Sequence, residues 1–204
     1  MHKIHTNALF IQIFRKQYIT LIILISGFLV SGCEKEATQQ KTINTYFDLK
    51  GLIENQIVYL NERKPKVTKT IVLNGKKEIN STASIDWKKE LELFTQADIN
   101  KPAYKNSYSI IRKNAAEFEY RLNAKEDLNV RFLKVKMDTI QKQPRFIQAL
   151  LRSENRIYES EKYIELTFSN INNEWQPVSY SVKGYQKLLM MDPKTFNVFA
   201  KIGL

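Results

Sequence analysis

Apolar and polar residues alternate along the chain from about residue 104 to its end. In residues 117–123, Phe118, Tyr120 and Leu122 alternate with charged and polar residues. A period of two residues is typical of a strand with one buried face and one solvent face. The same period continues, with turn-like stretches in between, in residues 128–137, 144–153, 162–170, 177–191 and 195–203. Short strands joined by turns, with no helix between them, predict an antiparallel meander of six or seven strands.

The segment before the meander has a helical period, because its apolar residues recur every three or four positions. We expect one helix that begins near residue 44 and ends before Pro65. Thr45 and Asp48 stand three residues apart, which fits a capping box at its start. The apolar stripe of this helix consists of Tyr46, Leu49, Ile53, Ile57 and Leu60.

A hairpin and a second helix are expected between the first helix and the meander. Asn74-Gly75 lies between two runs rich in β-forming residues, and this pair favours a type I′ turn because both of its positions need a positive φ. Residues 84–100 again have a helical period, and Asp86 is a suitable N-cap. The core side of this second helix is expected to carry Trp87, Leu91 and Phe94.

These elements predict an α+β fold. It would have two N-terminal helices flanking a β-hairpin, followed by a curved antiparallel meander of six or seven strands. One face of an antiparallel sheet has to be covered, and two amphipathic helices with strong sheet curvature would cover it. This arrangement leaves room for a cavity between the sheet and the helices.

The N-terminal segment has the composition of a secretory signal peptide. Residues 1–32 contain no Asp or Glu, while Lys3, Arg15 and Lys16 give them a positive front. The apolar run from residue 18 to residue 30 has 13 residues, fewer than the roughly 20 that a membrane-spanning helix needs. A positive front, a short apolar core and small residues after it indicate export. The alternative is a short N-terminal membrane helix that holds an incidental cysteine.

The end of this segment, Val30-Ser31-Gly32-Cys33, resembles the lipobox of bacterial lipoprotein precursors, and Cys33 is the only cysteine of the chain. The resemblance implies that the Cys33 thiol receives a diacylglycerol, that the chain is cleaved between Gly32 and Cys33, and that the new amino group is acylated. Residues 33–43 would then be an acylated tether, and residues 44–204 a single domain. The resemblance further implies a cell-envelope location, with the outer membrane favoured over the inner membrane.

Composition then narrows the possible chemistry. Both histidines lie in the signal segment, so that the mature chain offers neither histidine nor a free thiol for nucleophilic catalysis or a zinc site. Its glycines are too scattered for a phosphate-binding loop. We therefore expect no catalytic residue, no metal and no cofactor. A hydrolase that uses carboxylates is the less favoured alternative, with the candidate acids Glu117, Glu119, Asp138, Glu165 and Asp192.

The mature chain keeps 29 Lys and Arg against 21 Asp and Glu, a net charge of +8. Export argues against nucleic acid as the partner of this basic surface. The main hypothesis is a binding or carrier lipoprotein for an apolar or lipid ligand, since the expected plan resembles that of the lipoprotein-localisation carriers. The alternative is a structural or accessory lipoprotein that binds another envelope protein, with Trp175 and Tyr185 at its interface.

Overall fold

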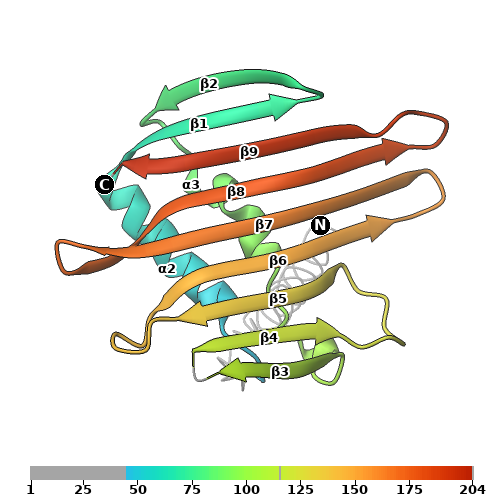
Figure 1. The fold of residues 1–204 in the computed structure, drawn as a ribbon, viewed down its shortest axis with the longest axis horizontal. Helices are drawn as coiled ribbons and strands as arrows, with labels where there is room; N and C mark the ends of the chain where they lie inside the picture. The colour runs from blue at the N-terminus through green and yellow to red at the C-terminus, as the bar shows by residue number, and fades with distance from the viewer. Residues whose placement is uncertain (1–44, 115, 204) are drawn as a thin grey trace, which may run out of the picture. The chain divides into compact units, whose positions relative to one another are not determined.

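The computed structural model of this chain describes residues 45–203 except residue 115 (Figure 1). These residues belong to one compact unit, Ile43–Leu204, which has its own hydrophobic core. The lipobox, Cys33 and the tether lie outside the described residues. No helix of residues 45–203, residue 115 apart, is both long enough and apolar enough to cross a membrane.

Nine antiparallel strands form a single sheet in the order β2-β1-β9-β8-β7-β6-β5-β4-β3 (Figure 1). The seven strands from β3 to β9 make the expected meander, in which each strand pairs with the next one along the chain. The bounds are β1 Lys66–Leu73, β2 Lys76–Thr82, β3 Tyr108–Asn114, β4 Glu117–Leu122, β5 Val130–Met137, β6 Pro144–Glu154, β7 Tyr158–Ile171, β8 Glu174–Leu188 and β9 Lys194–Gly203.

The predicted α+β class is wrong, because the chain is mainly β. The hairpin β1–β2 does not stand apart from the meander: β1 pairs with β9 along its whole length, for example Ile71 with Val198. The second predicted helix is also broken, since Leu91 has φ −97° and ψ 10° and divides it into α3, Trp87–Glu90, and α4, Glu92–Gln96. Only one of the helices within residues 45–203, residue 115 apart, is long, and the hairpin adds its two strands to the meander.

The turn of the hairpin and the cap of the second helix lie where the sequence predicted them, whereas the cap of the first helix lies later. Asn74 and Gly75 both have positive φ, 47° and 82°, as a type I′ turn needs. The long helix α2 spans Leu49–Arg63, and its N-cap is Asp48, whose carboxylate accepts from the Gly51 N–H at 2.9 Å. The expected cap at Thr45 is therefore placed three residues too early. Asp86 does cap α3, as predicted.

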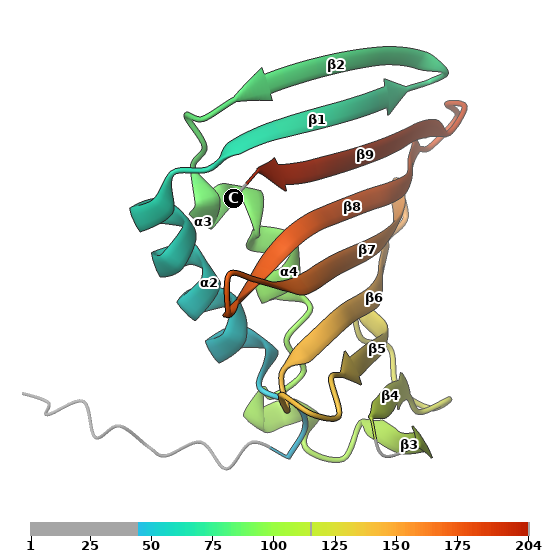
Figure 2. The same cartoon turned by 60° about the vertical axis from the view of Figure 1, so that its left-hand side comes forward.

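The helices lie against one face of the curved sheet, and Figure 2 shows them together on that side. Large apolar side chains fill the space between the two layers, and they are 0–2% exposed: Leu49, Ile53, Leu60, Trp87, Leu91, Phe94 and Ile99 from the helical side, and Leu133, Ile147, Ile164 and Leu166 from the sheet. A core packed in this way has little empty volume. The expected plan left room for a ligand cavity between the sheet and the helices. Side chains of the protein itself occupy this space.

A partly buried polar contact fixes α3 to the sheet. Glu90 accepts a short hydrogen bond from the hydroxyl of Tyr180 on β8, and Lys69 Nζ on β1 lies 2.6 Å from its other carboxylate oxygen. Burial, and next the hydrogen bond to Glu90, raise the pKa of Tyr180 well above its ordinary value, so the hydroxyl remains a donor. Because Glu90 faces the sheet, Lys88 and Lys89 of the same turn face outward.

Gly184 marks a place where β8 and β7 approach very closely. A Cβ at this position would lie 1.9 Å from the carbonyl oxygen of Glu161 and 3.2 Å from Cα of Lys162, both backbone atoms of β7. Gly184→Ala should therefore lower the free energy of unfolding by about 2–3 kcal/mol, the upper part of the range for an overpacked site.

Urea unfolding followed by far-UV circular dichroism measures this effect. Gly203→Ala is the matched control, because its Cβ would lie 3.1 Å from the Lys66 carbonyl oxygen and needs only a small shift at a strand end. We expect a loss below about 1 kcal/mol for the control. Equal stability of the two variants would contradict the close approach at Gly184.

Candidate functional site

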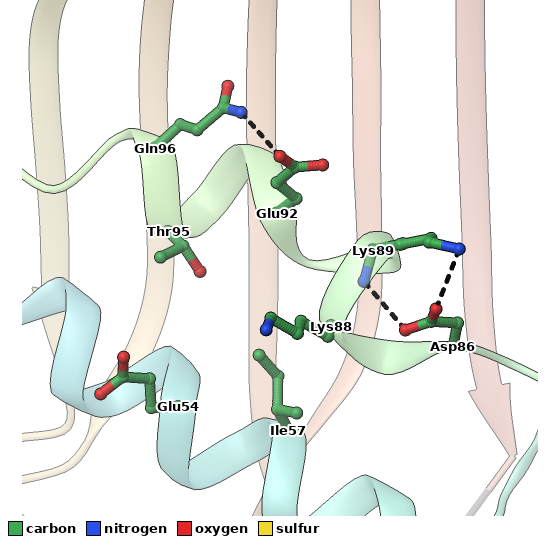
Figure 3. Close-up of a pocket in the computed structure, with 8 residues that line it drawn as sticks. All are labelled: Glu54, Ile57, Asp86, Lys88, Lys89, Glu92, Thr95 and Gln96. Carbon is green, nitrogen blue, oxygen red and sulfur yellow. Dashed lines mark hydrogen bonds and ion pairs between the residues drawn. The ribbon is translucent and has the colours of Figure 1, made fainter. Parts of the chain in front are cut away.

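A groove of about 620 Å³ lies between α2 and the α3–α4 segment, on the outer side of the helical layer. Figure 3 shows side chains from both segments that face one another across it. The volume is in the range of small-molecule sites in proteins, about 300–1,000 Å³. Its lining residues are Glu54 and Ile57 from α2, with Asp86, Lys88, Lys89, Glu92, Thr95 and Gln96 from the α3–α4 segment.

Helical spacing places the α2 wall of the groove. Ile53 is fully buried against the sheet, and Ile57, one turn later, is only partly buried at the edge of the core. Ile57 therefore presents its side chain to the groove as an apolar floor (Figure 3). Glu54 lies next to Ile53 on the outer side of the helix and is exposed.

The α3–α4 wall depends on the break at Leu91. Trp87 and Phe94 anchor the two short helices to the core at 2% and 0% exposure. With these side chains directed inward, the intervening turns direct Lys88 and Thr95 toward the groove, as Figure 3 shows. An unbroken helix through Leu91 would give a different pattern of outward positions, since the side-chain direction advances by 100° per residue in a regular helix.

Most charged groups of the groove already have a partner. Lys89 Nζ lies 3.4 Å from Asp86, Gln96 donates to Glu92 at 3.1 Å, and Lys50 lies 3.8 Å from Glu54. Within residues 45–203, residue 115 apart, no carboxylate is within ion-pair distance of Lys88.

The Asp86 carboxylate is committed to the helix start. The backbone N–H of Lys89 donates to it at 3.2 Å, and this hydrogen bond is the main cause that lowers the pKa of Asp86. Asp86 therefore remains ionised at neutral pH, paired with its own helix. The groove thus combines an apolar floor at Ile57 with an ammonium group at Lys88 and a hydroxyl at Thr95 that are available to a ligand.

Trp175 and Tyr185, the predicted interface residues, both lie on β8 and not on the groove. Trp175 is the second residue of β8 and follows the turn between β7 and β8. Its indole N–H donates to the Pro144 carbonyl oxygen at 2.7 Å, and its ring is partly buried against the core. The Tyr185 hydroxyl donates to Glu159 at 2.6 Å, and this bond is the largest cause that raises its pKa.

Two candidate acids of the hydrolase alternative, Glu119 and Glu165, are engaged in other contacts. Glu119 is 4% exposed and accepts a short hydrogen bond from Arg121, with Lys134 4.0 Å away. Glu165 accepts from Gln148 and Ser181 at 2.9 and 3.0 Å. These contacts make each carboxylate a bonded acceptor within the protein.

Two further acids of that alternative are in turns. The Asp138 carboxylate accepts from the backbone N–H groups of Gln141 and Ile140, which lower its pKa, the bond from Gln141 being the main cause. Asp192 lies in the exposed turn between β8 and β9. Among residues 45–203, with residue 115 left out, no three acidic, His or Cys side chains gather in a group that could hold a metal ion.

The sequence did not reveal the groove, because its residues had other interpretations. Ile57 was predicted as part of the apolar stripe of the first helix, and Lys88 belongs to no motif that marks a binding site. A comparison of the chain with protein-family models, with curated proteins and with solved structures finds no match.

Proposed function

We propose that this chain is a lipid-anchored, non-enzymatic binding protein of the cell envelope, and that the groove between α2 and the α3–α4 segment holds an apolar or lipid ligand. The anchor follows from the resemblance of Val30-Ser31-Gly32-Cys33 to a lipobox. The binding role is supported by one observation above all, the combination of Ile57, Lys88 and Thr95 in a groove of about 620 Å³.

The chemistry of the groove favours an amphiphile with a negative head group. The ammonium group of Lys88 would pair with the anionic head, and the hydroxyl of Thr95 would donate to one of its oxygens. The apolar chain would lie over Ile57 and along the methylene stem of Lys88, which removes apolar surface from water. A carboxylate or phosphate attached to an acyl chain has this combination of groups.

The outer groove suits this role better than the space between the layers. Trp87 and Phe94 already occupy that space, and opening it would break the packing that stabilises the domain. The outer groove requires no such change, because it is already formed.

Native mass spectrometry of residues 43–204 with lysophosphatidylglycerol tests the proposed binding. We expect a one-to-one complex, and intensities over a titration give its dissociation constant. The neutral lysophosphatidylcholine is the comparison ligand and should bind more weakly, because its head group carries no net negative charge for Lys88. Binding of neither lipid to a folded domain would contradict the lipid role and favour the accessory role toward another envelope protein.

Paired variants place the ligand in the groove. Ile57→Asn should weaken binding at least about tenfold, while Val58→Asn, on the neighbouring position that is 58% exposed outside the groove, should not change it. Lys88→Gln should weaken binding of the anionic lipid about three- to tenfold, and Lys125→Gln, the charge-matched control outside the groove, should leave it unchanged. Equal effects of the groove variant and its control would place the ligand elsewhere.

A further inference from the structure

Two hairpin turns, between β6 and β7 and between β8 and β9, lie side by side at one end of the strands (Figure 1). Exposed apolar side chains gather at these turns. The backbone N–H of Leu189, in the β8–β9 turn, donates to the carbonyl oxygen of Ile157, in the β6–β7 turn, at 2.9 Å. We call this cluster the apolar tip. Its members and their exposed fractions are Ile157 63%, Leu188 50%, Leu189 60%, Met190 96% and Met191 47%.

The backbone conformation at position 190 favours other residue types than the methionine found there. Met190 has φ 62°, in the left-handed region where Gly, Asn and Asp are the usual residues. A large apolar side chain at this position is disfavoured by the backbone and exposed to water. Both costs would be offset if the side chain entered an apolar medium.

Several backbone N–H groups of the two turns are already hydrogen-bonded within the protein. Asn155 Oδ1 accepts from the N–H groups of Ile157 and Tyr158, both at 3.0 Å. The N–H of Met191 donates to the Leu188 carbonyl oxygen at 3.0 Å. Because unpaired N–H groups make the transfer of a loop into lipid costly, these bonds make such a transfer easier.

Basic residues surround the tip. Arg156, Lys187 and Lys194 are exposed, and no ion pair joins any of them to a carboxylate of the residues that the structure describes. The acids Glu154 and Glu159 are both paired with Arg152, at 3.0 and 3.6 Å. Arg152 is one positive charge against these two acids, and Asp192 is a third acid near the tip, so that the four basic residues Arg152, Arg156, Lys187 and Lys194 exceed the three acids by one charge.

We propose that the apolar tip is a contact site for an anionic bilayer surface. The side chains of Ile157 and of residues 188–191 enter the head-group region, and Arg156, Lys187 and Lys194 face the lipid phosphates. Apolar burial together with attraction of basic residues to anionic lipid is the mode by which peripheral proteins bind membranes. This inference goes beyond the ligand groove and does not depend on it or on acylation of Cys33.

Vesicle co-sedimentation with residues 43–204 tests the contact without the anchor. Vesicles of phosphatidylethanolamine with 30% phosphatidylglycerol are compared with vesicles of phosphatidylcholine alone. We expect at least about fivefold more protein on the anionic vesicles, with most of this excess lost at 0.5 M salt, because salt screens the charges. Equal sedimentation with both vesicles, or none with either, overturns the proposal.

The double variant Leu189→Asn/Met190→Asn tests the apolar part without adding a charge. It should lower binding to anionic vesicles at least about tenfold. Ile140→Asn is the matched control, since Ile140 is 84% exposed and lies in the β5–β6 turn, at the other end of β6. Binding of the tip variant equal to that of the control overturns the proposal. A natural domain that is dimeric on size-exclusion chromatography, together with a monomeric tip variant, also overturns it, because the tip would then be a contact between copies of the chain.

A second pair tests the charges. Arg156→Gln/Lys187→Gln should remove most of the preference for anionic vesicles. The control Lys142→Gln/Lys201→Gln should keep this preference, since both lysines are exposed at the other ends of the strands.

Residues 43–204 contain no cysteine, so Met190→Cys can carry a single environment-sensitive fluorophore. Its emission should shift to the blue on anionic vesicles, while the same fluorophore at Ile140→Cys stays unshifted. An unshifted probe at residue 190 also overturns the proposal.

Discussion

Cys33→Ala should abolish lipid attachment and leave a precursor that still carries its signal segment. Cys33 is the only cysteine of the chain, so no other thiol can replace it. The thiolate is the nucleophile that accepts the lipid, and the methyl group of alanine has no such reactivity. Two or more acyl chains give stable anchoring, since each buried methylene contributes about 0.8 kcal/mol. The variant therefore loses the modification completely instead of in part.

Metabolic labelling of the full chain with a radioactive fatty acid, together with its mobility on a denaturing gel, measures both effects. Ser31→Ala is the matched control, because alanine keeps a small residue before the cleavage point and leaves Cys33 in place. This control should be labelled and cleaved as the natural chain is. Normal labelling and cleavage of Cys33→Ala would show that the resemblance to a lipobox is misleading.

Trp87→Ala should lower the free energy of unfolding of the domain by about 3–5 kcal/mol. Trp87 is 2% exposed and is the largest of the fully buried side chains. Its removal takes away apolar contacts and leaves a cavity between α3 and the sheet, which the short helix cannot close because Glu90 is tied to Lys69 and Tyr180. Since small domains are stable by only about 5–15 kcal/mol, the variant should be close to unfolding at ambient temperature.

Equilibrium unfolding in urea at neutral pH gives this value, with far-UV circular dichroism as the probe. Lys88→Ala is the matched control: it changes the next residue of the same helix, exposed and outside the core, and should alter stability by less than about 0.5 kcal/mol. A loss below about 1.5 kcal/mol in Trp87→Ala would mean that α3 is only loosely packed on the sheet.

Local patterns in the sequence were sufficient to predict most of the secondary structure. The helical period before Pro65 predicted α2, and Asn74-Gly75 predicted the turn of the hairpin, where both residues have positive φ. The period of two residues predicted the strands of the meander, because the alternation of faces is a property of the strand itself. Asp86 was found as a cap for a similar reason, since its hydrogen bond reaches only three residues along the chain.

The fold class was wrong because it depended on a contact between distant parts of the chain. The pairing of β1 with β9 joins residues 66–73 to residues 196–203 and turns the hairpin into part of the sheet. Nothing within either segment specifies that partner, since backbone hydrogen bonds along an exposed strand edge are the same for many sequences. The break at Leu91 is likewise absent from the local pattern, since Trp87, Leu91 and Phe94 keep a continuous helical period across it.

The sequence by itself determined the chemistry available to this protein: one cysteine in a lipobox-like segment, no histidine after residue 5, and the alternation that makes its strands. Tertiary structure alone decided where side chains meet. It brought Ile57 and Lys88 to one groove, and it placed Ile157 beside Leu189 although 31 residues separate them. Residue types and the local periodicity of apolar residues are properties of the sequence itself. A surface shared by several elements arises only when strands and helices distant in sequence pack together.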